Sequence, residues 1–339
     1  MNAIRSAVSV GVLLLAVAST GAAPLWAQVA HPALSFGWVD TVSSSPLYPE
    51  MAVVPENPAL LAWSFPVLSY GTLHVERDSV PPDPATQQIL EGYAFGFGMP
   101  NNLSKKGGIS YPAWGFAIER EVLASVTATV EYDASGTSLG YAREANPSLA
   151  TGIGISSRQV RENAQTDKMT GFQFGAVFMV YPDVFVGVVV AEDRRNSTGG
   201  ASEFKSKRQE KKLGLAWGNQ SRMIREVSTP KAGSSLFHVE VYGIQREPHV
   251  DGTGAMVDAQ SEQHLVMEIE RGWFLASADV GRFEVDQRGG TFSTFNVGIG
   301  FSRYFHVSTY VSETERDTAA GTRESINTAG TWANLFFSF

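Results

Sequence analysis

The sequence predicts an all-β protein, a transmembrane antiparallel β-barrel of about 14 strands, with 12 or 16 strands as the alternatives. Three observations predict this class: an alternating strand that ends in an aromatic residue, a short apolar leader, and alternating runs throughout the chain. Beyond the leader, no apolar run approaches the roughly 20 residues of a membrane helix. A chain that stays in a membrane must therefore cross it as a barrel.

The carboxyl end carries apolar residues at every second position, at Leu335, Phe337 and Phe339. This period is typical of a strand with one apolar face. A free terminal aromatic on such a strand resembles the insertion signal of bacterial outer-membrane barrels. We therefore expect these three residues to be the insertion signal and the barrel assembly machinery to be a partner.

The amino end has the layout of a secretory signal peptide: a cationic start at Arg5, an apolar stretch over residues 7–18, and then small residues. We predict a signal peptide over residues 1–27, cleaved after Ala22 or Ala27. An uncleaved interfacial anchor is the alternative. Export followed by barrel insertion predicts a bacterial outer-membrane location, with outer-membrane lipids and lipopolysaccharide as neighbours.

The composition excludes several functions. A net charge of -8 and a pI near 5.3 leave no basic footprint for nucleic acid. A mean hydropathy of -0.06 fits a barrel, because lipid-facing apolar residues alternate with polar lumen residues. The 339 residues include no cysteine, which excludes disulfides, thiolate metal sites and a lipid-modified cysteine. No cofactor is expected.

Alternating runs recur along the chain, one of them from Val122 to Tyr132. A β-sandwich has the same period but usually shorter strands, and many runs here reach the roughly 9–11 residues of a tilted membrane strand. The polar members of the later runs are expected to line the lumen. They are His238, Glu240, Tyr242, His264, Glu268, Glu270, Asn296 and His306.

Connection lengths predict the orientation. Polar stretches at residues 191–209, 243–262, 281–290 and 312–327 alternate with tight turns. Long loops outside and short turns in the periplasm are typical of these barrels, so Phe339 is expected on the periplasmic side. The connection at residues 218–233 departs from this pattern. The basic cluster Lys205–Lys212 is either a solvated loop or a patch for an anionic partner such as lipopolysaccharide.

Strand parity sets the expected domain boundaries. About fifteen candidate strands follow Val67, whereas single-chain bacterial barrels have an even number. Parity is restored if the barrel comprises residues 90–339, starting near Gly92. Residues 28–89 are then expected to form a plug in the lumen or a periplasmic segment.

A family resemblance starts at Asn57-Pro58-Ala59-Leu60, which resembles a stretch near the mature amino end of the long-chain fatty-acid transporter family (FadL) and of the related PorV/PorQ proteins. The hairpins at residues 138–154 and 174–188 are also similar to that family. Leu60 replaces the family's usual glycine. The resemblance implies a fourteen-stranded barrel with its amino-terminal segment, including this plug motif, in the lumen.

The resemblance also implies a function, which is passive passage of small hydrophobic molecules. The alternative is a structural or docking role in an export or envelope complex, as in the PorV/PorQ proteins. Fatty-acid-type members open sideways at a kinked strand, and Pro112 is the candidate kink here. Because proline is also common at strand starts, Pro112 could instead begin a strand without any opening.

No enzyme is predicted. Gly136-Thr137-Ser138-Leu139-Gly140 matches the nucleophile elbow G-x-S-x-G, but that motif requires a strand that turns into a helix, and a hairpin turn explains these glycines better. The histidines at 238, 264 and 306 lack metal-binding spacing and a paired nucleophile. We therefore expect them to be solvated lumen residues.

Overall fold

In the computed structural model of the 339-residue chain, the described residues are almost entirely β-structure. It describes residues 47, 57–63, 67–80, 88–99, 113–124, 132–146, 148–162, 165–199, 204–218, 235–250, 256–257, 259–271, 274–285, 288–302, 305–317 and 323–338. No helix within these ranges is long and apolar enough to cross a membrane. The predicted signal peptide at residues 1–27, Pro112 and Phe339 lie outside them.

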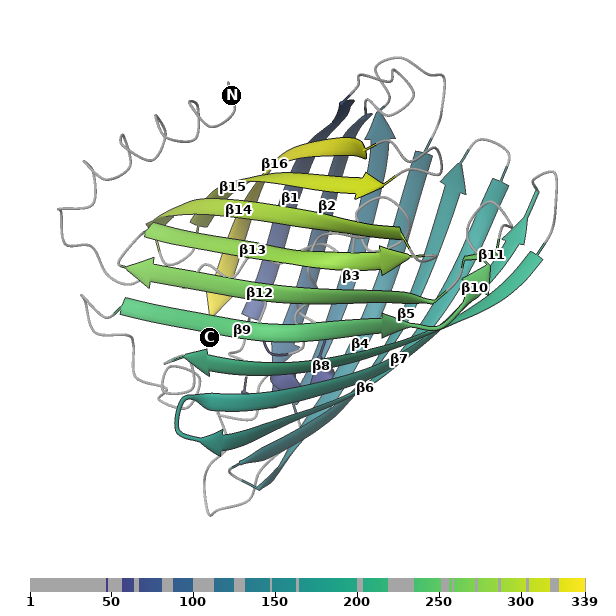
Figure 1. The fold of residues 1–339 in the computed structure, drawn as a ribbon. Coiled ribbons are helices and arrows are strands. Elements are labelled where there is room, and N and C mark those ends of the chain that lie inside the picture. The colour runs from purple at the N-terminus through teal and green to yellow at the C-terminus, as the bar shows by residue number, and fades with distance from the viewer. Residues whose placement is uncertain are drawn as a thin grey trace.

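The strands form one closed antiparallel barrel (Figure 1). In the described part of the chain its order is β1-β16-β15-β14-β13-β12-β9-β8-β7-β6-β5-β4-β3-β2, and a separate hairpin pairs β10 with β11. The wall strands are β1 (Val67–Val80), β2 (Gln88–Met99), β3 (Ala113–Ala124), β4 (Tyr132–Asn146), β5 (Leu149–Glu162), β6 (Gln165–Tyr181), β7 (Val184–Thr198), β8 (Phe204–Gly218), β9 (Ser235–Arg246), β12 (Gln260–Arg271), β13 (Phe274–Val285), β14 (Arg288–Ser302), β15 (Phe305–Asp317) and β16 (Arg323–Ser338). The hairpin strands are β10 (His249–Val250) and β11 (Met256–Val257), and the 3-10 helix η1 is Pro58–Trp63.

The two faces of the wall follow from the alternation of the sequence. Apolar side chains point outward, including Ile155, Phe172, Leu213, Val241 and Phe295. Polar side chains between them are buried inside, and Glu240 is completely inaccessible. Because a closed barrel pairs every backbone group of its wall, it can hold this apolar exterior in lipid. The predicted fold class, an all-β antiparallel barrel, is confirmed.

The expected boundary between residues 89 and 90 differs from the structure. β1 belongs to the wall, where Val67 pairs with Ser338 of β16 and with Gly98 of β2. The last strand needs a partner to close the barrel, and β1 provides it. Only residues before Val67 can therefore form a plug.

Several polar stretches that were expected to be loops are strand extensions. β7 continues to Thr198, and β8 begins at Phe204, so much of residues 191–209 is strand. β13 likewise extends to Val285 and β15 to Asp317. The alternation of charged residues there continues the pleat, and the β7–β8 ladder pairs residues as far as Ser197 and Phe204.

Two further expectations were wrong in detail. The run from Val122 to Tyr132 is the end of β3 and the start of β4, with residues 125–131 outside the described ranges. Gly136–Gly140 lies in the middle of β4 and forms no turn.

The tight turn expected after β6 is present in the structure. Asp183 adopts a φ of 69° there, a conformation that Asp tolerates.

Candidate functional site

The plug motif lies inside the barrel, against the inner face of one wall. Asn57 is completely buried, and η1 begins directly after it. The Ala59 N–H donates to Asn57 Oδ1 at 3.1 Å, and the Leu60 N–H donates to the Asn57 carbonyl at 3.0 Å. Asparagine at an N-cap followed by proline at the first helical position favours this local start.

The side chain of Asn57 also ties η1 to the barrel. Its Nδ2 donates to the Ala176 carbonyl of β6 at 3.3 Å. η1 contacts β3, β4, β5 and β6, near the end where the β4–β5 and β6–β7 turns lie. One asparagine therefore caps the short helix and attaches it to the wall.

Two glycines give η1 room to approach. Gly152 of β5 and Gly175 of β6 face each other in the ladder. A Cβ atom on Gly152 would lie 2.5 Å from the Pro58 carbonyl carbon, and one on Gly175 would overlap Asn57 Oδ1. Glycine inside a strand often marks such a close backbone approach.

An apolar cluster surrounds the plug motif. Its buried members are Leu47, Ala59, Leu60, Leu61, Ala62, Ala142, Ala150, Val177 and Ala216, and Phe185 packs against them. Leu60 is only 3% exposed. Its side chain fills this interface and adds apolar contact between η1 and the wall.

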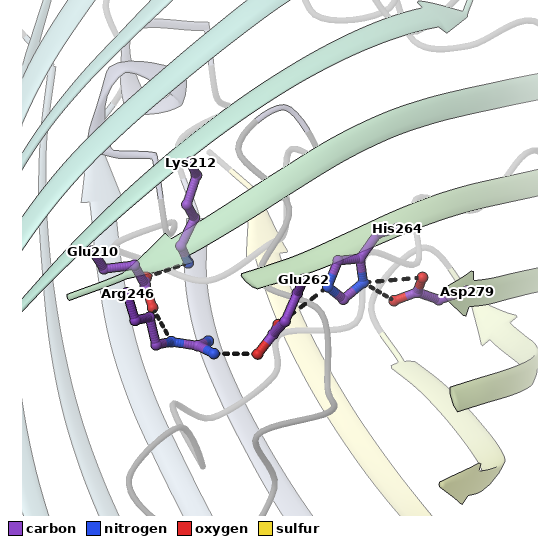
Figure 2. A network of polar contacts seen from close by, with 6 residues as sticks. All are labelled: Glu210, Lys212, Arg246, Glu262, His264 and Asp279. Atoms are coloured by element: carbon purple, nitrogen blue, oxygen red, sulfur yellow. Dashed lines mark hydrogen bonds and ion pairs between the residues drawn. The ribbon is translucent and has the colours of Figure 1, made fainter. Parts of the chain in front are cut away.

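A second inner region is a chain of buried charges on β8, β9, β12 and β13 (Figure 2). Lys212 Nζ lies 3.0 Å from Glu210 Oε1, and Arg246 Nε donates to Glu210 Oε2 at 2.6 Å. Arg246 Nη1 also donates to Glu262 Oε1. All four side chains are at most 10% exposed. Buried charges are tolerated only when paired, and Arg246 pairs two carboxylates at once.

His264 lies at the end of this row of buried charges. Its Nε2 lies 3.2 Å from Glu262 Oε2, and its Nδ1 lies 3.2 Å from Asp279 Oδ2. The imidazole stacks on the Tyr242 ring at 4.3 Å with an interplanar angle of 7°, and Phe292 packs nearby. A general base needs one ring nitrogen free for a nucleophile. Since carboxylates occupy both nitrogens, His264 serves the network and has no place for a nucleophile.

Of the other residues predicted to line the lumen, the structure describes the side chains of some but not of all. His238, Glu240, Tyr242, Glu268 and Asn296 are buried on the inner face. His238 Nε2 lies 3.1 Å from Glu240 Oε2. Glu270 lies on β12 and His306 on β15, but their side chains fall outside the described part. The structure brings His264 and Tyr242 together and places His238 with Glu240.

Most of the charge network was not among the residues predicted from the sequence. Arg246 and Glu262 fell in a stretch expected to be a loop, and Glu210 fell in the basic cluster expected to be either a solvated loop or a patch for an anionic partner. A signal was present, because Glu262 continues the two-residue period of His264 and Glu268, and Asp279 lies on a strand that pairs with theirs. Extending each alternation past its last apolar residue would have found them.

The remaining site predictions lie at the edges of the described chain. Pro112 directly precedes the first residue of β3, Ala113. Leu335 and Phe337 lie on β16, paired with Tyr70 and Leu68 of the closing strand. Among the described side chains, no group of three or more His, Asp or Glu could hold a metal ion.

Comparisons with known proteins support the fold. No protein-family model and no curated protein sequence matches the chain. Among solved structures, a Pseudomonas aeruginosa FadL homologue is 10% identical, with 93% of this chain and 99% of that chain covered and a TM-score of 0.51. The Ralstonia pickettii toluene transporter TbuX is 11% identical, with 89% and 98% covered and a TM-score of 0.51.

The Pseudomonas putida toluene transporter TodX is 8% identical, with 85% of this chain and 93% of that chain covered and a TM-score of 0.50. These likenesses extend over nearly the whole of each protein. The chain therefore has a FadL-like β-barrel fold, as the resemblance at the plug motif predicted.

Proposed function

We propose that this chain is an outer-membrane β-barrel through which small hydrophobic molecules pass passively. The outward apolar side chains and the FadL-like fold support a membrane location. The toluene transporters with similar folds support a hydrophobic solute. Assembly would use the barrel assembly machinery, acting on the strand that contains Leu335 and Phe337.

The plug motif carries this proposal. η1 covers inner wall near one end of the barrel, and the cluster around Leu60 and Val177 is apolar. An apolar solute would be favoured next to this surface, whereas a hydrated solute would lose its water there. This surface is buried while η1 packs on it, so the proposed place of passage is the interface between η1 and the wall, opened when η1 moves away from the wall.

A second candidate is a docking role without transport, as in the PorV/PorQ proteins. The buried charges from Lys212 to Asp279 favour it, because they make one inner wall polar and join its strands through ion pairs. Such a network rigidifies a wall and offers nothing to an apolar solute. In this case the barrel would serve as a scaffold for a partner protein.

An uptake assay separates the two. Cells that carry the protein in their outer membrane are compared with cells that lack it, using radiolabelled toluene and radiolabelled sucrose. The transport proposal predicts saturable toluene uptake and unchanged sucrose uptake. An increase in both solutes would indicate an open porin. No increase in either, together with a co-purifying envelope protein, would support the docking role.

A further inference from the structure

The outer face of β5–β8 carries a group of cations at one end of the barrel. Arg161, Lys168, Arg194, Lys205, Lys207 and Lys211 are exposed on it, and we call them the cationic rim. Arg194 and Lys207 are directly opposite each other in the β7–β8 ladder. Neighbouring strands lie about 4.8 Å apart, so one anionic group can reach cations from several strands.

Strand alternation gives these cations their direction. On β8, Glu210 and Lys212 point inward and pair with each other, while Lys207 and Lys211 point outward and are 51% and 58% exposed. The basic cluster in the sequence therefore divides between the two faces. Lys205, Lys207 and Lys211 belong to the rim, whereas Glu210 and Lys212 belong to the buried charge network.

The carboxylates on this face do not balance the cations. Glu192 contacts both Arg194 and Lys207 at 2.9 Å, and Glu247, which follows β9, contacts Lys211 at 3.2 Å. Across the described outer face of β5–β8 and the start of the β9–β10 connection, six cations thus face two carboxylates. By contrast, the outward face of β13 and β15 carries Glu284, Glu313 and Glu315 beside Arg282.

The cationic rim directly adjoins the apolar exterior. On β8, Lys211 is two residues from Leu213, which is 61% exposed, and across the ladder it faces Val190. On β6, Lys168 is four residues from Phe172, which is 49% exposed. A ligand that fits both regions must combine anionic groups with acyl chains.

We propose that the cationic rim binds the phosphate groups of lipopolysaccharide while its acyl chains contact the apolar residues beside the rim. The inference rests on the proposed outer-membrane location, with the carboxyl end of β16 on the periplasmic side. The rim is at the opposite end of the barrel and so at the level of the outer leaflet. Arginine and lysine are the usual partners of phosphate, and cations next to a membrane favour anionic lipids.

The test measures binding of lipid A to the purified full chain in detergent. Fluorescent lipid A is used with its phosphates intact and after dephosphorylation. The substitutions Lys168→Gln, Arg194→Gln, Lys207→Gln and Lys211→Gln are combined in one variant. We expect the variant to bind intact lipid A about tenfold or more weakly than wild type, and wild type to lose affinity for the dephosphorylated lipid.

Two matched variants control for charge and position. Lys168→Arg, Lys207→Arg and Lys211→Arg together should retain binding, because the charge is kept. Glu313→Gln combined with Glu315→Gln removes two carboxylates from the outward face of β15, at the same end of the barrel, and should not weaken binding. Heat-modifiable migration on gels reports whether each variant forms a barrel, and if the fourfold variant does not, Lys207→Gln alone is measured over a range of salt.

The inference is overturned if the folded fourfold variant, or Lys207→Gln in its place, binds intact lipid A as wild type does. It is also overturned if both lipid forms bind wild type equally, or if inorganic phosphate displaces the lipid completely. Loss of heat-modifiable barrel in the wild-type protein itself would instead contradict the proposed membrane location. The two failures are therefore distinguishable.

Discussion

A Cβ atom on Gly152 would come within 2.6 Å of the Pro58 carbonyl oxygen, so the plug motif and β5 are in contact through backbone. Neither group can turn aside as a flexible side chain would. Gly152→Ala must therefore displace η1 from the wall. We expect this variant to assemble normally and to show higher ion conductance than wild type in planar bilayers.

Gly136→Ala is the matched control for that change. Gly136 also lies inside a strand of the wall, β4. A Cβ atom there would meet its nearest neighbour, the Ser157 carbonyl oxygen, at 3.6 Å, which is an ordinary contact. The conductance of the Gly136→Ala variant should equal that of wild type. Equal conductance of Gly152→Ala and Gly136→Ala would mean that η1 does not block the lumen.

Asn57→Ala should loosen η1 by a different route. The change removes the N-cap acceptor for Ala59 and the donor to Ala176. Loss of an N-cap alone costs about 0.5–2 kcal/mol. Hydrogen exchange measured by mass spectrometry should show faster exchange in the peptide that contains Leu60 and Leu61, with the β12–β14 peptides unchanged. Unchanged exchange at η1 would contradict the capping role.

Arg246→Ala should destabilise the barrel strongly. It leaves Glu210 and Glu262 buried without the cation that pairs both. Removing one partner of a buried ion pair costs about 3–5 kcal/mol. Lys211→Ala, which breaks an exposed pair with Glu247, should cost about 1 kcal/mol or less. Urea titration of the two variants, with heat-modifiable migration as the readout, gives the midpoint of unfolding of each. Similar midpoints for Arg246→Ala and Lys211→Ala would show that the network is not buried.

Neighbouring positions on β14 test the two faces. Phe295 points outward and is 53% exposed, whereas Thr294 is on the inner face, opposite Asp279 in the ladder. Phe295→Arg places a charge in lipid and should cost about 2–4 kcal/mol near the midplane. Thr294→Arg adds a cation beside a carboxylate and should be tolerated. Equal stability of both variants in lipid vesicles would contradict the assignment of the faces.

The alternation of the sequence predicted the barrel because lipid on one side and a polar interior on the other impose a two-residue period. It also placed His238, Glu240, His264 and Glu268 on one side of the wall, where they are buried together. The period cannot show where a strand leaves the membrane. β7 and β8 were therefore expected to end near Ala191 and Gln209, although their ladder continues to Ser197 and Phe204.

Other features depend on contacts between segments far apart in the sequence. The boundary of the plug was placed too late because β1 joins the wall through its pairing with β16, and a local pattern does not reveal a closing partner. Arg246 becomes a network residue only through Glu210 and Glu262, at separations of 36 and 16 residues. Gly152 and Gly175 gain their meaning from Asn57 and Pro58, about a hundred residues earlier.

The most direct test of the account is the single-channel conductance of the full chain compared with a variant that lacks residues 28–64. This deletion removes Asn57 and all of η1 but spares β1, which closes the barrel. We expect low conductance for the full chain and a stable open pore for the variant, with heat-modifiable migration preserved. Equal conductance of two folded proteins would contradict the claim that this segment blocks the lumen.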